Sequence, residues 1–380
     1  MNEKVKILFS VIIISVCFFT GYIFYGDKDG TESDNPTDTD SDISSTEQVQ
    51  ITTEGVDDIH TSDEPQASYE LKTIGAMYVH YLDVGQGDCT LIVCKDEAMV
   101  IDSGMDNQGT KIQYYLMQQG VEKIKYLILT HSDSDHIGSA DVVVTKFDIE
   151  KVIMNEYDTG TDTYDDFISA MEYKNYKTTP GNVGDIYKLG DATFEIIYPY
   201  EISDNTNNNS ISIVLTHGEN TFLFTGDGDF QAESQMVSSG KLPSIDVYKV
   251  GHHGSGYSSS EELLTCISPK YAIISVGKEN DYGHPHESVM NRFDSMGIKV
   301  FRTDEQGTIV AISDGINLDI NTGKTQDETI TYVCNTNTKK FHMPVCDSVN
   351  DMKEKNKMEV SLTREEVISL GYKPCGRCNP

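Results

Sequence analysis

The chain has 380 residues, of which 38% are hydrophobic and eight are cysteines. At about 100–200 residues per domain, this length allows two or three domains, and the apolar content is enough for one substantial core. A small protein held together by disulfides is therefore excluded. The formal net charge is −32, from 29 Lys and Arg against 61 Asp and Glu. This charge argues against a protein whose main surface binds phosphate groups.

The N-terminal segment 1–26 predicts a membrane anchor. Residues 7–25 carry no charge, and Lys4 and Lys6 precede them. An α-helix needs about 20 apolar residues to cross a bilayer, whereas the apolar region of a signal peptide is about 7–15 residues long. Because positive charges favour the cytoplasmic side, the rest of the chain should lie outside the membrane. We expect a single-pass cell-membrane protein with an extracellular main domain, or a secreted protein if the segment is cleaved.

Residues 27–70 predict an acidic disordered linker. This segment contains fourteen acidic residues and one lysine. Such a composition buries too little apolar surface to offset the chain entropy lost on folding, and its charges repel one another. A calcium-binding segment is the alternative, but the spacing of an EF-hand is missing.

Residues 71–322 contain short apolar runs separated by turn residues, which predict a domain of two packed β-sheets covered by helices. The expected strands are 78–84, 89–94, 98–102, 125–130, 194–199, 210–216, 221–227, 246–254, 271–277, 298–303 and 308–313. The expected helices are 113–120, 135–147, 261–268 and 289–296.

The strongest chemical motif is HSDSDH, residues 131–136, directly after an apolar strand. Four potential ligands within six residues cannot share one side of a helix or strand, but a loop can fold them around two centres. Imidazole and carboxylate suit zinc or manganese, and two metals about 3.5–4 Å apart can hold a hydroxide and clamp a displaced oxygen. A polar helix N-cap is the alternative interpretation.

Further segments strengthen the metal interpretation. Asp102 and Asp227 each stand where an apolar strand opens into a glycine-bearing loop. Strand ends at one rim of a sandwich can collect ligands without burying unpaired charge. The pair 252–253 (His-His) follows another strand, although loop histidines without a ligand role would look the same. His284 and His286 precede a predicted helix, where they stabilise a leaving group, hold a phosphate, or cap the helix.

The ordered segments LDVGQGDCTLI (82–92), VIDSG, LTHSDSDHIG, NNNSISIVL, FTGD, KVGHHGS and GHPH resemble the metallo-β-lactamase superfamily. Within it, they are most similar to the ComEC type found at the end of the competence DNA-uptake channel protein. The resemblance covers about residues 76–320 and implies an α/β fold, an αββα sandwich with a metal site at the sheet edge. It implies that Asp102 orients the ligating histidines. The side chains implied to bind two divalent ions, Zn²⁺ or Mn²⁺, are His131, Asp133, Asp135, His136, Asp227 and His252.

Two departures from the superfamily pattern concern the metal ion that His131 and Asp133 are implied to bind. Asp133 stands where the superfamily usually has histidine, and the ComEC branch usually has aspartate at this position too. A separate mid-domain histidine is missing, with Asn209 and Ser210 in its region. A site rich in oxygen ligands favours Mn²⁺ more strongly than a site made of histidines alone does. Occupancy by a single metal ion stays open. His217 is a substitute to consider.

The expected mechanism is hydrolysis by a metal-held hydroxide, with the metals neutralising charge on a phosphoryl oxygen. Asp135 is a candidate acceptor for the proton of the water. The candidates for contacting the scissile group are His253, His284 and His286. A nucleophile elbow of the GxSxG type, which a serine hydrolase of this class would need, does not occur.

Residues 331–380 predict a small zinc-binding module. Two short-spaced ligand pairs, His342 with Cys346 and Cys375 with Cys378, suit a closed tetrahedral Zn²⁺ site. Extracellular disulfides, Cys334–Cys346 and Cys375–Cys378 among the possible pairings, are the alternative. Between the pairs, SLTREEVISLG (361–371) predicts a helix capped by Ser361 or Thr363.

The stretch YVCNTNTKKFHMPVC…GYKPCGRCNP resembles the Ada-type metal-binding domain, whose zinc ligands fall on the same four residues. This resemblance leaves the role of Cys334 open. It also implies contact with DNA, with the candidate phosphate partners Lys339, Lys340, Lys373 and Arg377. A solvated charged face is the alternative.

Three functions remain in competition at this point. The first is an extracytoplasmic metal-dependent phosphodiesterase, above all a DNase, with a zinc module that binds DNA. The second is a hydrolase of phosphocholine, teichoic-acid or other esters, lactones or β-lactams, which the acidic charge of the main domain favours. The third is a non-catalytic protein that binds DNA or the cell envelope. No organic cofactor is expected.

Overall fold

The computed structural model describes residues 75–323, 330–378 and 380. The predicted anchor at 1–26 and linker at 27–70 lie outside these residues. Among the helices that the structure does describe, none is long and apolar enough to cross a membrane.

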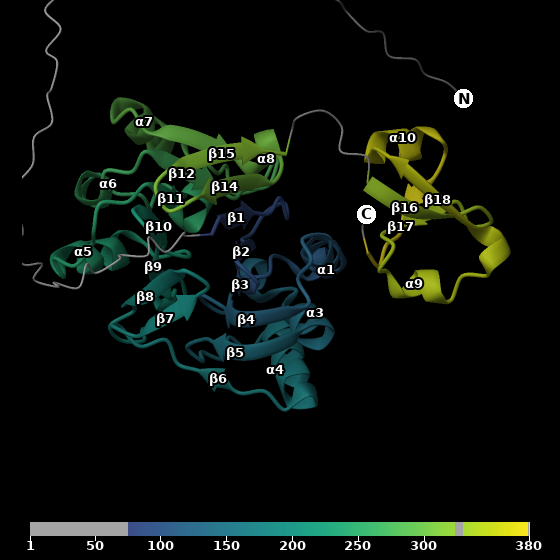
Figure 1. Cartoon of the computed structure of the whole chain (residues 1–380), viewed down its shortest axis with the longest axis horizontal. Coiled ribbons are helices and arrows are strands. Elements are labelled where there is room, and N and C mark those ends of the chain that lie inside the picture. Colours follow the sequence, from purple (N-terminus) through teal and green to yellow (C-terminus); the bar gives the residue numbers. More distant parts are fainter. Residues whose placement is uncertain (1–74, 324–329, 379) are drawn as a thin grey trace, which may run out of the picture. The chain divides into compact units, whose positions relative to one another are not determined.

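Two β-sheets form the centre of the larger domain (Figure 1). The first sheet has the order β15 (Leu318–Thr322), β14 (Ile309–Ser313), β1 (Met77–Tyr81), β2 (Thr90–Cys94), β3 (Glu97–Ile101), β4 (Lys123–Ile128), β5 (Asp148–Ile153) and β6 (Thr178–Thr179). The second has the order β13 (Lys299–Arg302), β12 (Tyr271–Ile274), β11 (Val247–Lys249), β10 (Asn220–Phe224), β9 (Ser212–His217), β8 (Ala192–Tyr198) and β7 (Ile186–Leu189).

The alternation of side chains along each strand explains why both faces of both sheets are covered. On β10, Phe222 and Phe224 enter the core between the sheets, whereas Leu223 packs on the outer face. On β2, Ile92 faces the core between the sheets and Leu91 faces outward. A strand with apolar residues at successive positions must be buried on two sides, because successive side chains point to opposite faces.

Helices cover the outer face of each sheet. The first sheet packs against α1 (Gly109–Gln118), α3 (Ala140–Lys146) and α4 (Asp162–Lys174), and the second against α5 (Phe230–Ser238), α6 (Glu261–Ile267) and α7 (Glu287–Ser295). Two single-turn helices, α2 (Ser134–Ile137) and α8 (Thr303–Gln306), lie in loops. The layers are therefore helix, sheet, sheet and helix, and the predicted α/β sandwich is confirmed.

Two sequence-based expectations need correction, and several elements were not predicted, among them α4, α5, β5 and β7. The helix expected at 135–147 is two helices, because the chain leaves helical geometry at Ser139 between α2 and α3. The strand expected at 246–254 ends at Lys249, and residues 251–254 form a 3₁₀ turn. Helix α4 was not predicted, although its buried residues Tyr164, Phe167 and Met171 follow helical spacing.

The C-terminal residues form a sheet of their own, with the order β18 (Lys357–Leu362), β16 (Ile330–Asn335), β17 (Lys340–His342) and β19 (Lys373–Pro374). Two short helices accompany it, α9 (Asp347–Asn350) and α10 (Arg364–Ser369). Thr363 caps α10 in a capping box with Glu366, whereas Ser361 belongs to β18. Of the two candidate caps, Thr363 is therefore the one used.

A buried carboxylate, Glu233 on α5, holds the start of α6. It accepts hydrogen bonds from the backbone N–H groups of Ser259 and Ser260, and Ser260 is the N-cap of α6. Burial raises the pKa of Glu233 from 4.5 to about 7, which its hydrogen bonds only partly offset. The folded protein therefore binds a proton that the unfolded chain has already lost between these pH values.

We expect the free energy of unfolding of the wild type to fall by about 3 kcal/mol relative to Glu233→Gln as pH rises from about 4.5 to about 7. Urea denaturation of both proteins across this range measures the difference. The exposed neighbour Glu262 provides a control, because Glu262→Gln should show no such drift. Parallel pH profiles for wild type and Glu233→Gln would contradict the prediction.

Candidate metal centre

The candidate metal centre lies where strands of both sheets end. In the first sheet, the parallel strands β3 and β4 lead into Asp102 and into the loop that begins at His131. In the second sheet, the parallel strands β10 and β11 lead into Asp227 and into the His252–His253 turn. Parallel neighbours present their carboxyl ends at the same edge of a sheet, which is where α/β proteins bind ligands. The topology thus gathers segments that are far apart in the sequence.

Asp102 and Thr130 fix the two histidines of the HSDSDH loop. Asp102 Oδ2 lies 2.8 Å from His136 Nδ1, and Thr130 donates its backbone N–H and its hydroxyl to the same carboxylate. His131 Nδ1 lies 3.2 Å from Thr130 Oγ1 and 3.3 Å from Ser210 Oγ. An imidazole whose Nδ1–H is engaged in this way presents the lone pair of Nε2 to a metal.

Asp227 is held beside this loop by the close approach of Gly226. A Cβ at Gly226 would lie 2.8 Å from Ser210 Oγ and 3.0 Å from Thr130 Cβ, so no side chain fits there. The backbone N–H of Asp227 donates to Ser210 Oγ at 3.0 Å. Asp227 Oδ1 then lies 3.2 Å from His136 Nε2. Ser210, in the region of the missing superfamily histidine, thus supports Asp227.

The His252–His253 turn brings two imidazoles to the other side of Asp227. Both residues have left-handed backbone conformations, with φ of 51° and 52°. His253 Nε2 lies 3.2 Å from Asp135 Oδ2 and 3.6 Å from Asp227 Oδ2, while His252 Nε2 lies 3.7 Å from Asp227 Oδ2. His253, which the sequence analysis placed as a substrate contact, is the member of the pair that clusters with other potential ligands.

The ligand atoms at this edge fit a pair of divalent cations. Three buried imidazole nitrogens, the Nε2 atoms of His131, His136 and His253, have no hydrogen-bond partner among the described residues, and Asp227 Oδ1 has none either. Leaving such atoms unpaired is costly unless another group occupies the space between them. In each of two overlapping sets, the ligand atoms lie within 4.8 Å of one another. The first set is His131, His136 and Asp227, and the second is Asp135, His136 and His253.

The electrostatics of the cluster also favour bound positive charge. Burial lowers the pKa of His136, but the charges of Asp227 and Asp102 outweigh it and raise this pKa well above its usual value. Likewise, burial lowers the pKa of His253, and the carboxylates around it raise it to about 10. Metal ions compete with these protons for the same nitrogens, so metal affinity should increase as pH rises.

Asp133 and Asp135 sit at the open side of the cluster. Asp133 Oδ2 lies 3.7 Å from His131 Nε2, and its side chain is 38% exposed. Burial raises the pKa of Asp135, but the neighbouring imidazoles of His253 and His136 lower it to about 2. Asp135 is therefore ionised at neutral pH, as a metal ligand or a hydrogen-bond acceptor for water must be.

A buried ion pair supports His253 from behind, and sequence reasoning missed it. Lys249 Nζ on β11 lies 2.8 Å from Asp88 Oδ2, and Asp88 Oδ1 lies 3.3 Å from His253 Nδ1. The same Nδ1 lies 3.0 Å from Ser275 O, which leaves Nε2 directed at the cluster. Asp88 belongs to the GQGD segment, and its position beside a glycine, like that of Asp227, is the signal in the sequence that could have identified it.

Replacing Lys249 with methionine should destabilise the fold by about 3–5 kcal/mol, because it leaves the buried charge of Asp88 without its partner. Lys270→Met is the matched control, since Lys270 pairs with Asp246 at 2.8 Å but its own side chain is 71% exposed. That surface pair should contribute about 0–1 kcal/mol. Urea denaturation measures both, and equal effects of the two substitutions would contradict the assignment.

The remaining histidines differ in their distance from the cluster. The ring of His284 lies 5.7 Å from that of His252 and 6.5 Å from that of His253, and burial lowers its pKa to about 4. His286 precedes α7 without capping it through its side chain. His217 is bonded to Ser313 Oγ at 2.7 Å and lies at the opposite end of β9 from the metal centre. It therefore does not substitute for the missing ligand.

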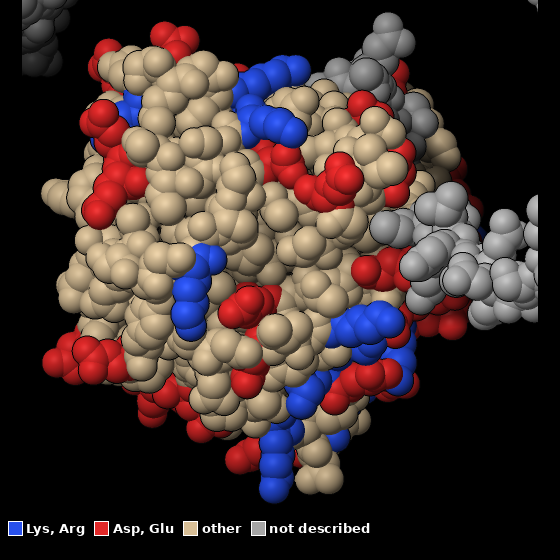
Figure 2. Space-filling view, turned by 60° about the vertical axis from the view of Figure 1, so that its left-hand side comes forward, with Lys and Arg blue, Asp and Glu red and all other residues tan. Residues whose placement is uncertain are grey.

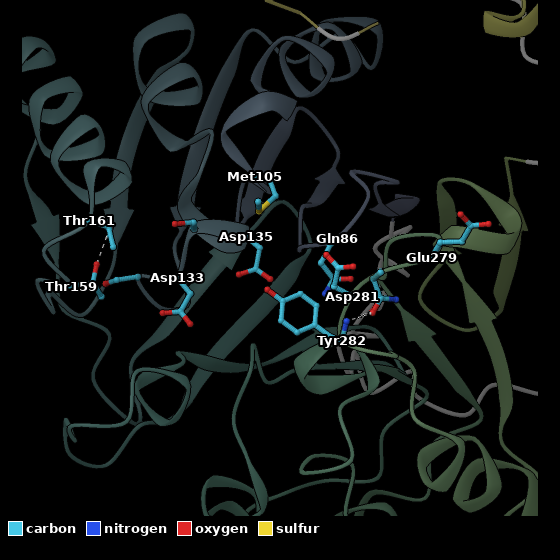
Figure 3. A pocket seen from close by; sticks show the side chains of 12 residues that line it. Gln86, Met105, Asp133, Asp135, Thr159, Thr161, Glu279, Asp281 and Tyr282 are labelled. Atoms are coloured by element: carbon cyan, nitrogen blue, oxygen red, sulfur yellow. Dashed lines mark hydrogen bonds between the residues drawn. The ribbon is translucent and has the colours of Figure 1, made fainter. Parts of the chain in front are cut away.

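A pocket of about 570 Å³ opens beside the cluster (Figure 3). Asp133 and Asp135 line it from the HSDSDH loop, and Tyr282 points into it from the loop after β12. Of the described residues that line the pocket, four carry carboxylates and none is Lys or Arg. A substrate in this pocket would reach the metal centre through an acidic opening.

The C-terminal residues contain a second potential metal site. The ligand atoms of His342, Cys346, Cys375 and Cys378 lie within 4.8 Å of one another, and all four residues are buried. Every described cysteine is a free thiol, so the alternative disulfides are not formed in this structure. Four such ligands match a closed structural zinc site. Cys334, whose role the sequence left open, is buried in the small core of the same region.

Comparisons with known proteins show which family and which relatives the chain resembles. The family model of the metallo-beta-lactamase superfamily matches residues 82–278. The chain is 30% identical to ComE operon protein 3 of Bacillus subtilis over 61% of this chain and 32% of that protein. It is 33% identical to competence protein ComA of Neisseria gonorrhoeae over 60% of this chain and 31% of that protein. The match thus spans about a third of each relative.

Among solved structures, the metallo-beta-lactamase fold protein YhfI from Bacillus subtilis is similar, with a TM-score of 0.44 and 12% identity over 65% of this chain and 100% of that chain. The resemblance to ComEC-type competence proteins that the ordered motifs predicted is confirmed by the sequence matches.

Proposed function

The chain belongs to the metallo-beta-lactamase superfamily, and from this premise we propose that it is an extracytoplasmic metal-dependent phosphodiesterase that cleaves DNA. The observation that carries the proposal is the set of buried, unpartnered ligand atoms of His131, His136, Asp227 and His253 at one sheet edge. The superfamily fold supports metal-dependent hydrolysis in general. The phosphodiester substrate, the metal identity and the location outside the membrane are parts of the proposal.

Different residues of the site would bind the metal ions, orient the imidazoles and contact the attacking water. Bound at this cluster, divalent metal ions would supply an activated water and neutralise the charge that develops on a phosphoryl oxygen. His131, His136, Asp227 and His253 would hold them, with Asp102 and Asp88 fixing the imidazoles. Asp135, ionised and lining the pocket, accepts a hydrogen bond from the attacking water.

We expect His284 to assist the leaving group. Its imidazole stays neutral because burial lowers its pKa to about 4, so it can donate one N–H to an oxygen without carrying charge. Its backbone is fixed by Asn280, whose side chain bonds to both the N–H and the C=O of His284. His286 contacts His284 through its ring, at 5.3 Å between centroids.

The C-terminal sheet supports the choice of DNA as the substrate. Lys340 and Lys373 are register partners on β17 and β19, and Lys339 lies in the turn that leads into β17. All three are exposed. The fourth candidate, Arg377, pairs with Asp347 at 3.1 Å. Exposed lysines on neighbouring strands can contact consecutive phosphates of a nucleic acid, which positions it without reading its sequence.

The charge of the hydrolase domain favours a second candidate. On the described part of the face in Figure 2, Lys and Arg are scattered among Asp and Glu and form no continuous basic band. Together with the acidic pocket, this favours a small or cationic-headed ester, such as a phosphocholine ester, over a polyanion. Two of the pocket carboxylates are candidate metal ligands, however, and bound metal would neutralise them.

The test is to incubate the purified chain with Mn²⁺ or Zn²⁺ and with single-stranded or duplex DNA. We expect metal-dependent degradation that EDTA stops. Hydrolysis of phosphocholine or carboxylic esters in the same preparation, without degradation of DNA, would favour the second candidate instead. A lack of hydrolysis across all metals and substrates would leave a binding role.

A further inference from the structure

Gln86, in the GQGD segment, lies between the HSDSDH loop and the loop after β12. Its side-chain Oε1 accepts a hydrogen bond from the backbone N–H of Gly277 at 3.2 Å. A Cβ at Gly277 would lie 2.7 Å from Gln86 N, so only glycine permits this approach. Two residues later in the GQGD segment, Asp88 N donates to Asp135 O at 3.1 Å. The segment is thus fixed to the loop that carries the candidate ligands.

The other end of the Gln86 amide has nothing to bind. Its Nε2 is buried and has no hydrogen-bond partner among the described residues. The orientation of the amide is well defined, because a flipped amide would set its NH₂ group against the N–H of Gly277. A buried donor without a partner costs about 1–3 kcal/mol, which a fold retains where a ligand completes the bond. Gln86 lines the same pocket as Asp133 and Asp135 (Figure 3).

The described residues that line the rest of the pocket offer an anion no positive charge. The side-chain nitrogen of Asn280 is already used by the carbonyls of Gly277 and His284. Besides the candidate ligands Asp133 and Asp135, two more carboxylates line the pocket, Glu279 and Asp281, and both residues are exposed. Among the described lining residues, an anionic substrate therefore meets neutral donors, the Gln86 amide and hydroxyl groups such as that of Tyr282, and a negative rim.

We propose that Gln86 donates its Nε2–H to a non-bridging oxygen of the substrate phosphate, and that this neutral donor selects phosphodiesters over phosphomonoesters. A diester carries one negative charge on the phosphate, whereas a monoester carries nearly two at neutral pH. The second charge would face the carboxylates of the rim with no Lys or Arg among the described lining residues to compensate. This inference rests on the proposed phosphodiesterase activity.

The test compares bis(4-nitrophenyl) phosphate with 4-nitrophenyl phosphate, which share a leaving group and differ in charge. The metal-loaded full chain should prefer the diester. Gln86→Met keeps the side-chain length but removes the donor, and it should lower kcat/KM for the diester by about 10²–10³-fold. Metal content should stay unchanged. Gln86→Lys should raise the ratio of monoester to diester hydrolysis.

Gln118→Met, at the exposed end of α1, is the matched control and should change neither rate. If Gln86→Met fails to fold, Gln86→Glu serves in its place, because it retains the acceptor for Gly277 and replaces the donor with a negative oxygen; it should lose at least as much diester activity. An active wild type whose Gln86 variants keep its rates and its monoester-to-diester ratio would overturn this inference alone. A wild type that hydrolyses no phosphodiester would overturn the proposed function, and this inference with it.

Discussion

Replacing Asp227 with alanine is expected to lower kcat/KM for phosphodiester hydrolysis by about 10³-fold or more, because it removes the carboxylate that touches both halves of the metal centre. One oxygen lies 3.2 Å from His136 Nε2, and the other lies 3.6 Å from His253 Nε2 and 3.7 Å from His252 Nε2. Steady-state kinetics on bis(4-nitrophenyl) phosphate, with metal analysis of the same samples, measures the effect.

Asp166→Ala provides the control for this substitution, because Asp166 is exposed on α4. It should keep full activity. In Asp227→Ala, His136 and His253 are also expected to lose positive charge, because Asp227 is the carboxylate that raises the pKa of both histidines most. An Asp227→Ala protein that is folded, retains both metals and turns over at the wild-type rate would contradict the placement of the site.

Replacing Cys375 with serine is expected to unfold the C-terminal region and to abolish the zinc binding that we expect there. The core of this region is small, and below about 70–80 residues an apolar core rarely supplies more than about 3–5 kcal/mol. Structural zinc binding contributes about 10–16 kcal/mol of apparent free energy in comparable small sites, so folding here should depend on the metal. Limited proteolysis of the full chain, together with zinc analysis, measures the effect.

The hydrolase domain should survive this substitution and still cleave bis(4-nitrophenyl) phosphate, while cleavage or binding of DNA weakens. Cys266→Ser is the control, because Cys266 is exposed on α6 and belongs to no ligand group of the described residues. Protease resistance and zinc content equal to the wild type in Cys375→Ser would refute a zinc-dependent fold. So would a Cys375–Cys378 disulfide in the purified protein.

Most of the sandwich was predictable because its strands are buried on two faces. Runs such as TFLFTGD and KYLILT must be strands that end at a loop, since apolar residues at successive positions leave no polar face. Helix α4 was missed because acidic residues interrupt its sequence, although Tyr164, Phe167 and Met171 are buried at helical spacing. The prediction of a strand through residues 252–253 was wrong because both histidines adopt left-handed backbone geometry. The residue types at these positions do not indicate this geometry.

The candidate ligands were predictable from local spacing, and their supporting contacts were not. The HSDSDH loop, Asp102 and Asp227 stand out because polar residues follow apolar strands. The pairing of Asp88 with Lys249 joins positions 161 residues apart, and a buried lysine in an apolar strand is not visible as such in one sequence. The clustering of His253, rather than His252, with the other potential ligands likewise depends on the turn geometry and not on residue type.

The number of metal ions bound per chain tests the central claim most directly. Mass-spectrometric metal analysis of the full chain, purified without chelators and supplemented with Mn²⁺ or Zn²⁺, should find about three divalent ions per chain. Two of them belong to the cluster of His131, His136, Asp227 and His253, and one to the site of Cys375 and Cys378. The Asp227→Ala protein should retain only the last. A single ion in the wild type, lost on Cys375→Ser and unaffected by Asp227→Ala, would show that the sheet edge holds no metal and would contradict the proposed activity.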